Sequence, residues 1–526
     1  MEDLDFSGLL ANCSDKGRTG YNPIMMYAVV TYANMRGIRS VDRIVDLCER
    51  DLAFIWLTRG KKTKCDAFYD FKNRKLTSDV LDDLNYQFMR RLQKEGLVTL
   101  KELFIDGTKI EANANRYTFV WRGSINYHLA GLLDSIDQLF EKYNSFLQEN
   151  DYGTKYELGN AQMFVIEGMD KVREVIEKNR KRKLVKHKKL SNNRIIEIDN
   201  CSPLEIRKLQ DNLTMIAVSE GIRFVYGKGK RKSVLQQLHE ELEQCGKRLM
   251  EYKECFEIMG KDRNSYSKTD LEATFMRMKE DYMLNGQLKP AYNVQIAVEN
   301  YFIVHGYVSS DRTDYNTLIP VLEKHKNAFG RILEEVTADS GYCSEKNLLY
   351  LKRNEISSYI KLQDHEKRKT RAYSEDISKY YNMRTGIFED EQFYICHDGR
   401  ELRHLRTESK EQDGYTQTFE VYGCADCSGC EHKARCLYKY DAEKDAEKNK
   451  VMKINEQWEE LKERSHANIQ SERGILKRQT RSIQTEGHFG DIKENENFRR
   501  FNYRSSDKVY KEFMLYAIGR NINKYH

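Results

Sequence analysis

Three acidic side chains, Asp106, Asp339 and Glu486, stand where they could hold divalent metal ions. Asp106 lies within a strand-like apolar segment, Asp339 ends another, and Glu486 lies in a late helical stretch. Transfer of a phosphodiester by two metals needs carboxylates that converge on ions roughly 3.5–4 Å apart. Mg²⁺ suits such a site because it is a hard cation that keeps waters and takes oxygen from phosphate. Lys493 follows Glu486 by about two helical turns, on the same face, where it could contact a phosphate.

The residue types alone leave this assignment open. An aspartate at a strand end is often a turn-former or a helix cap, and a glutamate in a charged helix is often only solvated. Asp270, Asp311 and Asp314 are competing carboxylates. The order of the elements favours the first set, because the strands that carry Asp106 and Asp339 are neighbours in a ribonuclease-H-like topology.

The elements between these carboxylates are typical of an α/β fold. Between Tyr292 and Val298 apolar residues alternate with polar ones, which predicts a strand, and Asn300 marks the turn to the next strand. Ser344 can cap the helix that follows Asp339. In chain order, we predict strands 103–110, 292–299 and 302–309, a helix 315–325, a strand 335–339, a helix 347–352 and a strand 358–362.

Helical segments flank and interrupt this core. Apolar residues from Ile24 to Ala33 repeat at helical spacing, Gly37 breaks the run, and Ser40 opens a second helix. Such short helices fit a helix-turn-helix-like DNA-binding module, and a plain packing domain fits them equally. After the first strand, charged helical patterns predict an inserted hairpin or coiled coil. Two basic runs in it could bind phosphate backbone or form a solvated face, Lys178–Lys189 and Gly227–Lys232.

Length and composition limit the class of protein. A chain of 526 residues is too long for one compact domain, and 40% hydrophobic residues can form a substantial core. The 88 Lys and Arg leave a net charge of only +6, so clustering of charge would have to support nucleic-acid binding. No apolar run reaches the roughly 18 residues of a membrane span, and no signal peptide is evident. We expect a cytoplasmic protein with no membrane partner.

A group of cysteines forms the strongest local signal. Four of the 12 cysteines lie within GCADCSGCEHKARC: Cys424, Cys427, Cys430 and Cys436. Cys-x-x-Cys spacing places two thiolates near one tetrahedral metal, and four sulfurs suffice for a closed zinc site. The alternatives are reduced thiols in a surface loop, or a site completed by Cys396, His404 or His432. We predict a structural Zn²⁺ in an insertion between the core strands and the Glu486 helix.

Four long phrases, in a fixed order along the chain, carry a family resemblance. They are FIDGTKIEANANRYTFVWRGS (104–124), DLEATFMRMKEDYMLNGQLKPAYNVQIAVEN (270–300), TADSGYCSEKN (337–347) and EGHFGDIKENENFRRFNYR (486–504). They resemble DDE transposases of bacterial insertion sequences, in particular the group called insertion sequence eleven-eighty-two. The stretch from residue 21 to 57 is similar to that group's N-terminal transposase domain. The resemblance covers nearly the whole chain.

The resemblance implies a function and a site. Asp106, Asp339 and Glu486 would be the three catalytic acids, with Mg²⁺ or Mn²⁺ as cofactor. The activity would be cleavage of DNA at the ends of a mobile element and joining of the 3′-hydroxyl to target DNA. The partners would be the terminal inverted repeats and target DNA, bound by a homodimer near the bacterial nucleoid. Related groups carry a tyrosine and an arginine before the glutamate; here Arg481 is one position from the expected place, and no tyrosine stands at that spacing.

Basic residues just past Glu486 complete the predicted site. Arg499, Arg500 and Arg504 are interleaved with aromatic residues and would contact DNA near the cut, although packing of the aromatics explains the pattern equally well. Two other functions stay open: an inactive or domesticated transposase that only binds DNA, and a nuclease without strand transfer. We predict a helical DNA-binding domain 1–98, core strands in 99–124 and 265–363, a charged helical insertion 125–264, a Cys-rich insertion 364–455 and a C-terminal helical part of the core 456–526.

Overall fold

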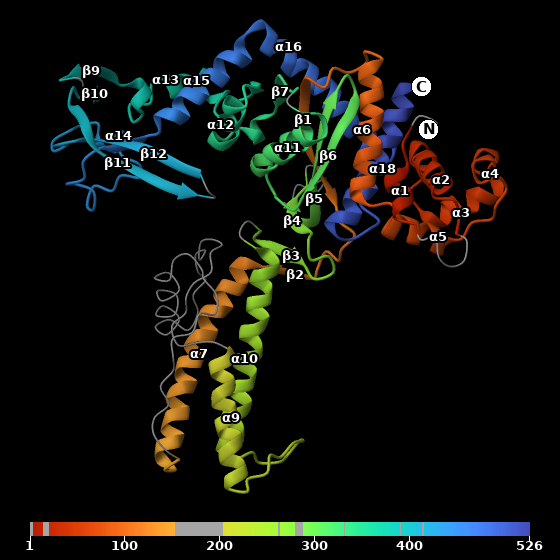
Figure 1. Ribbon diagram of the computed structural model, residues 1–526. Coiled ribbons are helices and arrows are strands. Elements are labelled where there is room, and N and C mark those ends of the chain that lie inside the picture. Colours follow the sequence, from red (N-terminus) through yellow and green to blue (C-terminus); the bar gives the residue numbers. More distant parts are fainter. Residues whose placement is uncertain are drawn as a thin grey trace.

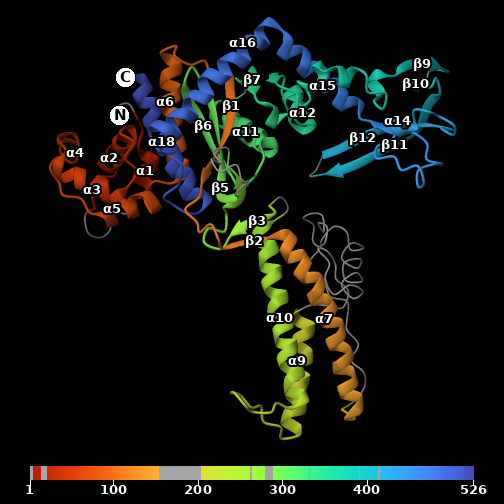
Figure 2. The same ribbon diagram turned by 180° about the vertical axis from the view of Figure 1, so that it is seen from behind.

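A central sheet organises the molecule. The computed structural model describes residues 4–13, 20–152, 203–260, 263–278, 288–330, 332–389, 391–412 and 415–526. Helices from the N-terminus lie to one side of the central sheet, and a second sheet lies to the other side (Figure 1). A helical arm projects away from both, and the view from behind shows the same arrangement (Figure 2). None of the described helices combines the length and apolar character that a membrane crossing requires.

The central sheet combines antiparallel and parallel pairing. Strand β5 pairs antiparallel with β1 along one edge and with β4 and β6 along the other. Strand β1 also pairs in parallel with β7, and β7 with β8. This mixed order fits the predicted ribonuclease-H-like core, to which the structure adds β4. The strands are β1 (Glu102–Glu111), β4 (Thr274–Arg277), β5 (Leu288–Glu299), β6 (Phe302–Ser309), β7 (Glu335–Ala338) and β8 (Ser357–Ile360).

Strand β5 is buried on both faces of the central sheet. All its residues from Pro290 to Glu299 are buried. The apolar set that begins at Tyr292 packs in the core with helix α18 (Ser506–Tyr525). Asn293 and Gln295 point to the opposite face and are equally buried, so their amides need hydrogen-bond partners inside the protein.

Helices cover both faces of the central sheet. Helix α18 lies between the sheet and the N-terminal helices, because Phe513 and Tyr516 pack on the sheet while Met514 and Ile518 pack on the N-terminal side. Three helices build the core on the other face: α6 (Ser78–Lys94), α11 (Leu318–Phe329) and α12 (Glu345–Arg353). As predicted, the Ser344 side chain caps α12 by accepting from the amide of Asn347 at 3.2 Å.

The N-terminal region is helical, as predicted. Helix α2 begins at Pro23 after Asn22, whose side chain accepts from two amides of the first turn. Asp51 caps α4 in the same way. The bounds are α1 (Ser7–Ala11), α2 (Pro23–Met35), α3 (Val41–Arg50), α4 (Leu52–Thr58), α5 (Cys65–Asp70) and the π-helix η1 (Phe71–Lys75).

The arm has its own hydrophobic core. A two-stranded sheet of β2 (Phe119–Trp121) and β3 (Ser265–Ser267) joins it to the central sheet. Its long helices are α7 (Arg122–Glu149), α9 (Pro203–Ser219) and α10 (Val234–Met259), packed through residues such as Tyr143, Leu213 and Leu242. The run Gly227–Lys232 lies largely exposed between α9 and α10, whereas Lys178–Lys189 lies outside the described residues.

The region predicted as a Cys-rich insertion contains a five-stranded antiparallel sheet that the sequence analysis did not predict. Its strands follow the order β13-β12-β11-β10-β9. They are β9 (Arg384–Phe388), β10 (Glu391–Ile395), β11 (Glu401–Gln412), β12 (Tyr415–Cys424) and β13 (Val451–Ile454). Around them lie the 3₁₀ turns η4 (Lys367–Lys369) and η5 (Tyr380–Asn382) and the short helices α13 (Arg371–Ser374) and α14 (Lys433–Cys436).

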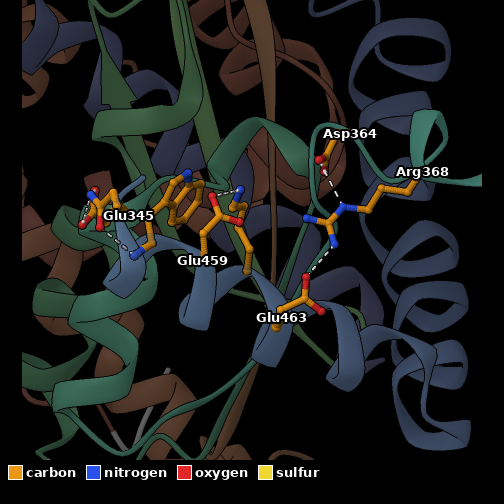
Figure 3. A network of polar contacts seen from close by, with 8 residues as sticks. Glu345, Asp364, Arg368, Glu459 and Glu463 are labelled. Atoms are coloured by element: carbon orange, nitrogen blue, oxygen red, sulfur yellow. Dashed lines mark hydrogen bonds and ion pairs between the residues drawn. The ribbon is translucent and has the colours of Figure 1, made fainter. Parts of the chain in front are cut away.

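One buried carboxylate attaches this second sheet to the core. Glu345, the first residue of α12, accepts from Gln417 of β12 at 2.6 Å and from the Tyr415 hydroxyl. It also accepts two bonds of 2.9 Å from Asn455, the residue that caps α15 (Glu456–Gln470) (Figure 3). The Glu345 side chain therefore joins the core, the second sheet and the start of the helix that leads back to the core.

A second set of ion pairs continues this contact along α15. Arg368 donates to Asp364 at 3.1 Å and to Glu463 of α15 at 2.9 Å (Figure 3). One turn earlier, Lys462 pairs with Glu459 at 2.6 Å. These groups are partly exposed, so each pair contributes little alone, and the buried Glu345 contributes most of the polar attachment.

We predict that Glu345→Ala loosens the second sheet. The change leaves the buried amide of Asn455 and the half-buried amide of Gln417 without this acceptor, which should cost about 2–4 kcal/mol. Limited proteolysis should then cut the 364–455 region faster than in the wild type. Glu460→Ala is the matched control, because Glu460 makes only an exposed pair with Lys352. Equal resistance of both variants to protease would contradict the assigned role of Glu345.

A buried histidine pair lies beneath β6 and predicts acid sensitivity. His305 Nε2 and His325 Nδ1 are 2.9 Å apart, and His325 Nε2 lies 3.0 Å from the Leu100 carbonyl. Burial lowers the pKa of His325 to about 4 and lowers that of His305 well below its usual value. Both rings are therefore neutral in the folded protein, and the unfolded chain takes up protons first as the pH falls.

The contribution of this pair to the free energy of unfolding should be constant above about pH 6.5 and should fall between pH 6.5 and 4, by about 3 kcal/mol from His325 alone. Urea titrations across that range measure it. His325→Gln should flatten the profile, whereas His128→Gln, an exposed control on α7, should not. A wild-type profile without this decrease would show that the pair does not govern acid stability.

Candidate active site

The pairing of β1 with β7 brings two aspartates together. In this parallel pair Ile105 lies opposite Ala338, so Asp106 and Asp339 follow at neighbouring positions. The Asp106 carboxylate accepts from the amide of Gly107 at 2.8 Å, and Asp339 accepts from the amide of Gly341. Each carboxylate is thus oriented by the backbone that follows it. The predicted pairing of the two strands that carry or precede Asp106 and Asp339 is confirmed.

A third aspartate, Asp314, lies against the same two turns. Its oxygens sit 3.0 Å from the points where a Cβ would stand at Gly107 and at Gly341. A Cβ atom at Gly341 would also lie 3.3 Å from Asp339 Oδ1. A side chain at Gly107 would also meet Gln295 at 2.5 Å. The two glycines therefore make room for Asp314 beside the strand ends.

Buried amides hold Asp314 in place. Asn293 and Gln295 donate to Asp314 Oδ1 at 2.8 and 3.0 Å, and the Tyr342 hydroxyl donates to Gln295. These are the polar residues that the buried strand β5 turns toward this face. Burial raises the pKa of Tyr342 well above its usual value, and the negative charges of Asp314, Asp106 and Asp339 add to the shift. All three carboxylates therefore act on one buried phenol.

A helix runs along the strands that carry these aspartates. Residues four apart on it contact the sheet in turn, because they share one helix face. On α16 (Glu472–Arg481), Arg473 pairs with Glu335 at 2.6 Å, and Lys477 pairs with the same carboxylate at 2.8 Å. Arg481 then donates to Asp106 Oδ2 at 2.8 Å.

Thr485 makes the next contact of this face, donating to Asp106 Oδ2 at 3.1 Å. It lies on the π-helix η6 (Ser482–Glu486), where backbone bonds link residues five apart. Arg481 and Glu486 thus lie one helical turn apart, although Arg481 stands one position earlier in the sequence than the arginine of the related groups. The π turn accounts for that displacement. Glu486 itself is exposed, at the end of η6.

The acidic group suits a hard cation, and a cation already contacts it. Asp106, Asp314 and Asp339 lie near one another where β7 ends beside β1, and carboxylate oxygen is the donor type that Mg²⁺ prefers. In the structure the guanidinium of Arg481 contacts Asp106 Oδ2. Across the described residues, no three His, Cys, Asp or Glu side chains stand close enough together to hold a metal ion.

The competing carboxylates separate in the structure. Asp270 is buried and accepts from the Tyr292 hydroxyl at 2.9 Å, away from the strand ends. Asp311 accepts from Ser309 at 2.9 Å in its local turn. Only Asp314 of this set faces the pair. Asn293 and Gln295 were the available signal, since two amides on a strand buried on both faces require a polar partner.

The predicted DNA-contact residues lie beyond η6, past the short helix α17 (Gly487–Gly490) and the π-helix η7 (Asp491–Asn495). Lys493 is buried, with 8% of its surface exposed. Arg499 is exposed and pairs with Glu494 at 2.6 Å. Arg500 and Arg504 are exposed and donate to the segment after β1, including a 2.8 Å bond from Arg504 to the Asn113 carbonyl. The interleaved Phe498 and Phe501 are core residues.

The cysteines gather at one end of the second sheet. Cys424 ends β12, and its thiol donates to the Asp426 carbonyl at 3.2 Å. The Cys427 sulfur accepts from the amide of Lys450 at 3.3 Å. Next to Cys396, the His397 ring packs edge-on against His432, with centroids 4.7 Å apart.

Burial raises the pKa of the Cys436 thiol, Lys450 opposes the shift, and the thiols of Cys396, Cys427 and Cys430 add to it. Cys396 therefore belongs to the same group as the four predicted cysteines. His404 instead pairs with Glu420 at 2.7 Å on the exposed part of β11 and is turned away from the thiols by that contact.

Two regions of the chain match known protein families. Residues 395–526 match the family described as transposase DDE domain, and residues 2–89 match the family described as transposase domain (DUF772). The first region contains Glu486 and most of the second sheet, and the second contains the N-terminal helices. Asp106 and Asp339 lie between the two matched regions. No match was found among curated proteins or among solved structures.

Proposed function

The chain belongs to the DDE transposases of insertion sequences, and on that premise we propose that it cuts DNA at the ends of its own mobile element and joins the freed 3′-hydroxyl to target DNA. The observation that carries this proposal is the grouping of Asp106, Asp339 and Asp314 where β7 ends beside β1. The insertion-sequence group eleven-eighty-two remains a prediction.

In this proposal Asp106, Asp339 and Glu486 hold the divalent ions, Mg²⁺ or Mn²⁺, and Asp314 adds negative charge beside them. When bound, such ions lower the pKa of a water and stabilise the charge that develops on phosphate oxygens. Thr485 and the amide of Gly107 orient the Asp106 carboxylate. No serine or tyrosine nucleophile is assigned, because water and then the 3′-hydroxyl attack the phosphorus directly.

Arg481 has two roles in this mechanism. Without an ion it neutralises Asp106, which limits repulsion among the carboxylates. With DNA bound, its guanidinium can turn to a phosphate oxygen, for which its planar fork is suited. The exposed Arg499, Arg500 and Arg504 would contact DNA farther along, while the buried Lys493 would reach a phosphate only after local movement. Two ends must be brought together, so the active form on DNA would be a homodimer.

Cleavage of a duplex that carries the element's own ends, with Mg²⁺ or Mn²⁺, tests the proposal. Asp106→Ala and Asp339→Ala should lower the rate by about a thousandfold or more, because each removes a proposed ligand. Asp314→Asn should lower it by about ten- to a hundredfold, since it acts on neighbouring ligands. Asp311→Asn is the matched control and should cut like the wild type. A pre-cut end tests joining separately.

Each outcome discriminates between functions. Cuts without joined products would make the protein a nuclease that does not transfer strands. Binding of the ends without cuts would favour an inactive, DNA-binding derivative of a transposase. Equal cutting by wild type and Asp339→Ala would show that the proposed carboxylates are not the catalytic group.

We further propose that the cysteine group binds a structural Zn²⁺, through Cys424, Cys427, Cys430 and Cys436 or with Cys396 in place of Cys424. Two observations support this proposal. The Cys427 sulfur already accepts a hydrogen bond from a backbone amide, and Cys396 lies near enough to Cys424 to act on the pKa of its thiol. Zinc would hold together the end of the sheet that carries few buried apolar side chains.

Reduced protein purified without chelator should contain about one equivalent of zinc, measured by elemental analysis. Cys436→Ser should lose the metal and unfold the second sheet at a lower temperature, whereas Cys13→Ser should change neither. Comparing Cys396→Ser with Cys424→Ser identifies the fourth ligand by which variant loses zinc. Metal-free wild-type protein would contradict the zinc proposal.

A further inference from the structure

Helix α4 presents two large apolar side chains to solvent. Leu52 is 84% exposed and Trp56 is 77% exposed, and the two lie four residues apart on one face. On the opposite face, Phe54 and Thr58 are fully buried in the N-terminal helices. The helix is therefore anchored by one face, and packing within the described part of the chain does not account for Leu52 and Trp56 on the other.

A basic loop follows this face directly. Arg59, Lys61, Lys62 and Lys64 are all exposed, and none forms an ion pair with another described residue. The nearest acidic residue in sequence is the exposed Asp66, two positions after Lys64, so the loop carries four cations beside one carboxylate; Asp51, at the other end of α4, is occupied in capping its start. An exposed aromatic and aliphatic pair thus borders a patch of positive charge, which we name the α4 surface.

Hydrogen bonds and two left-handed residues hold the backbone of the α4 surface in one conformation. Arg59 adopts a left-handed conformation with φ of 53°, and Gly60 follows with φ of 71°. The Gly60 amide donates to the Ile55 carbonyl at 2.9 Å, and the Tyr21 hydroxyl donates to the Lys62 carbonyl at 2.7 Å. A left-handed position usually holds glycine or asparagine, so an arginine there is held in a disfavoured conformation.

We propose that the α4 surface binds duplex DNA, with Arg59 and the three lysines on phosphates and with Trp56 and Leu52 against sugars and base edges in a groove. This inference rests on the proposed function. Clustered exposed cations fit the regular negative charge of a duplex, and apolar side chains beside them fit groove contacts and wedges between base steps. Helix α4 lies at the outer end of the N-terminal helices, clear of the central sheet and the arm (Figures 1 and 2).

Fluorescence anisotropy of the full chain with a labelled duplex of the element's end tests the proposal, at several salt concentrations and without divalent ions. Trp56→Ser should weaken binding by about tenfold. The variant K61A/K62A/K64A should reduce the slope of log K against log salt by about 0.9 for each phosphate that the lysines neutralise in the wild type. Arg50→Ala and Leu10→Ser are the controls: Arg50 is exposed on neighbouring α3 but paired with Asp46, and Leu10 is 46% exposed.

Arg59→Gly separates binding from folding. Glycine accepts the left-handed conformation without strain, so the melting temperature should stay level or rise while the affinity for DNA falls. Trp56→Phe should abolish most of any DNA-induced quenching of tryptophan fluorescence, since the chain has only 3 tryptophans and the others lie half-buried.

The outcomes separate this inference from the proposed function. If Asp339→Ala fails to cut while the α4 variants bind and cut like the wild type, the function stands and the α4 surface does not bind DNA. If the α4 variants change the oligomeric state and leave affinity for DNA unaltered, the surface is an interface between copies of the chain and the inference is overturned. Wild-type protein that binds no duplex would overturn both.

Discussion

Repulsion among carboxylates at the point where β7 ends beside the middle of β1 is the constraint on which the rest of the site depends. Parallel pairing places Asp106 and Asp339 next to each other, and Asp314 enters from the side. Like charges at such distances disfavour the ionised forms unless hydrogen bonds or cations compensate. The compensation is visible in each case: backbone amides for two of the aspartates, two buried side-chain amides for Asp314, and the guanidinium of Arg481 for Asp106.

The same constraint explains why the basic helix α16 packs along β7 and β1. Three successive turns of the segment from Arg473 to Arg481 contact acidic groups along β7 and β1. Thr485, four residues after Arg481, continues that face onto Asp106 and lies within the π turn of η6. Glu486, the next residue, ends η6 and is exposed beside this contact. A π turn at such a place is typical of functional sites.

The sequence predicted the parts of this arrangement that have a local signal. Alternation in β5, the cap at Ser344 and the strand ending at Asp339 all depend on neighbours in sequence, and all appear in the structure. The second sheet escaped prediction because its longest strand, Glu401–Gln412, is mostly exposed and highly charged, without apolar alternation. The part played by Asp314 had only an indirect signal, the two amides of the buried strand β5, because its position also depends on glycines from two separate segments. The π turn has no sequence signal that distinguishes it from an ordinary helix.

The long separations in sequence between the acidic residues have a physical consequence. The arm lies between Asp106 and Asp339, and the second sheet lies between Asp339 and Glu486, so the site forms only after distant segments have docked. Glu345 and Asn455 join the second sheet to the helix that leads to Glu486, which makes the position of that glutamate depend on the docking. In the proposed complex, four carboxylates and one guanidinium leave an excess of negative charge that divalent ions offset. Divalent ions would favour an inward position of Glu486 in that complex, because repulsion among the carboxylates opposes such a position in their absence.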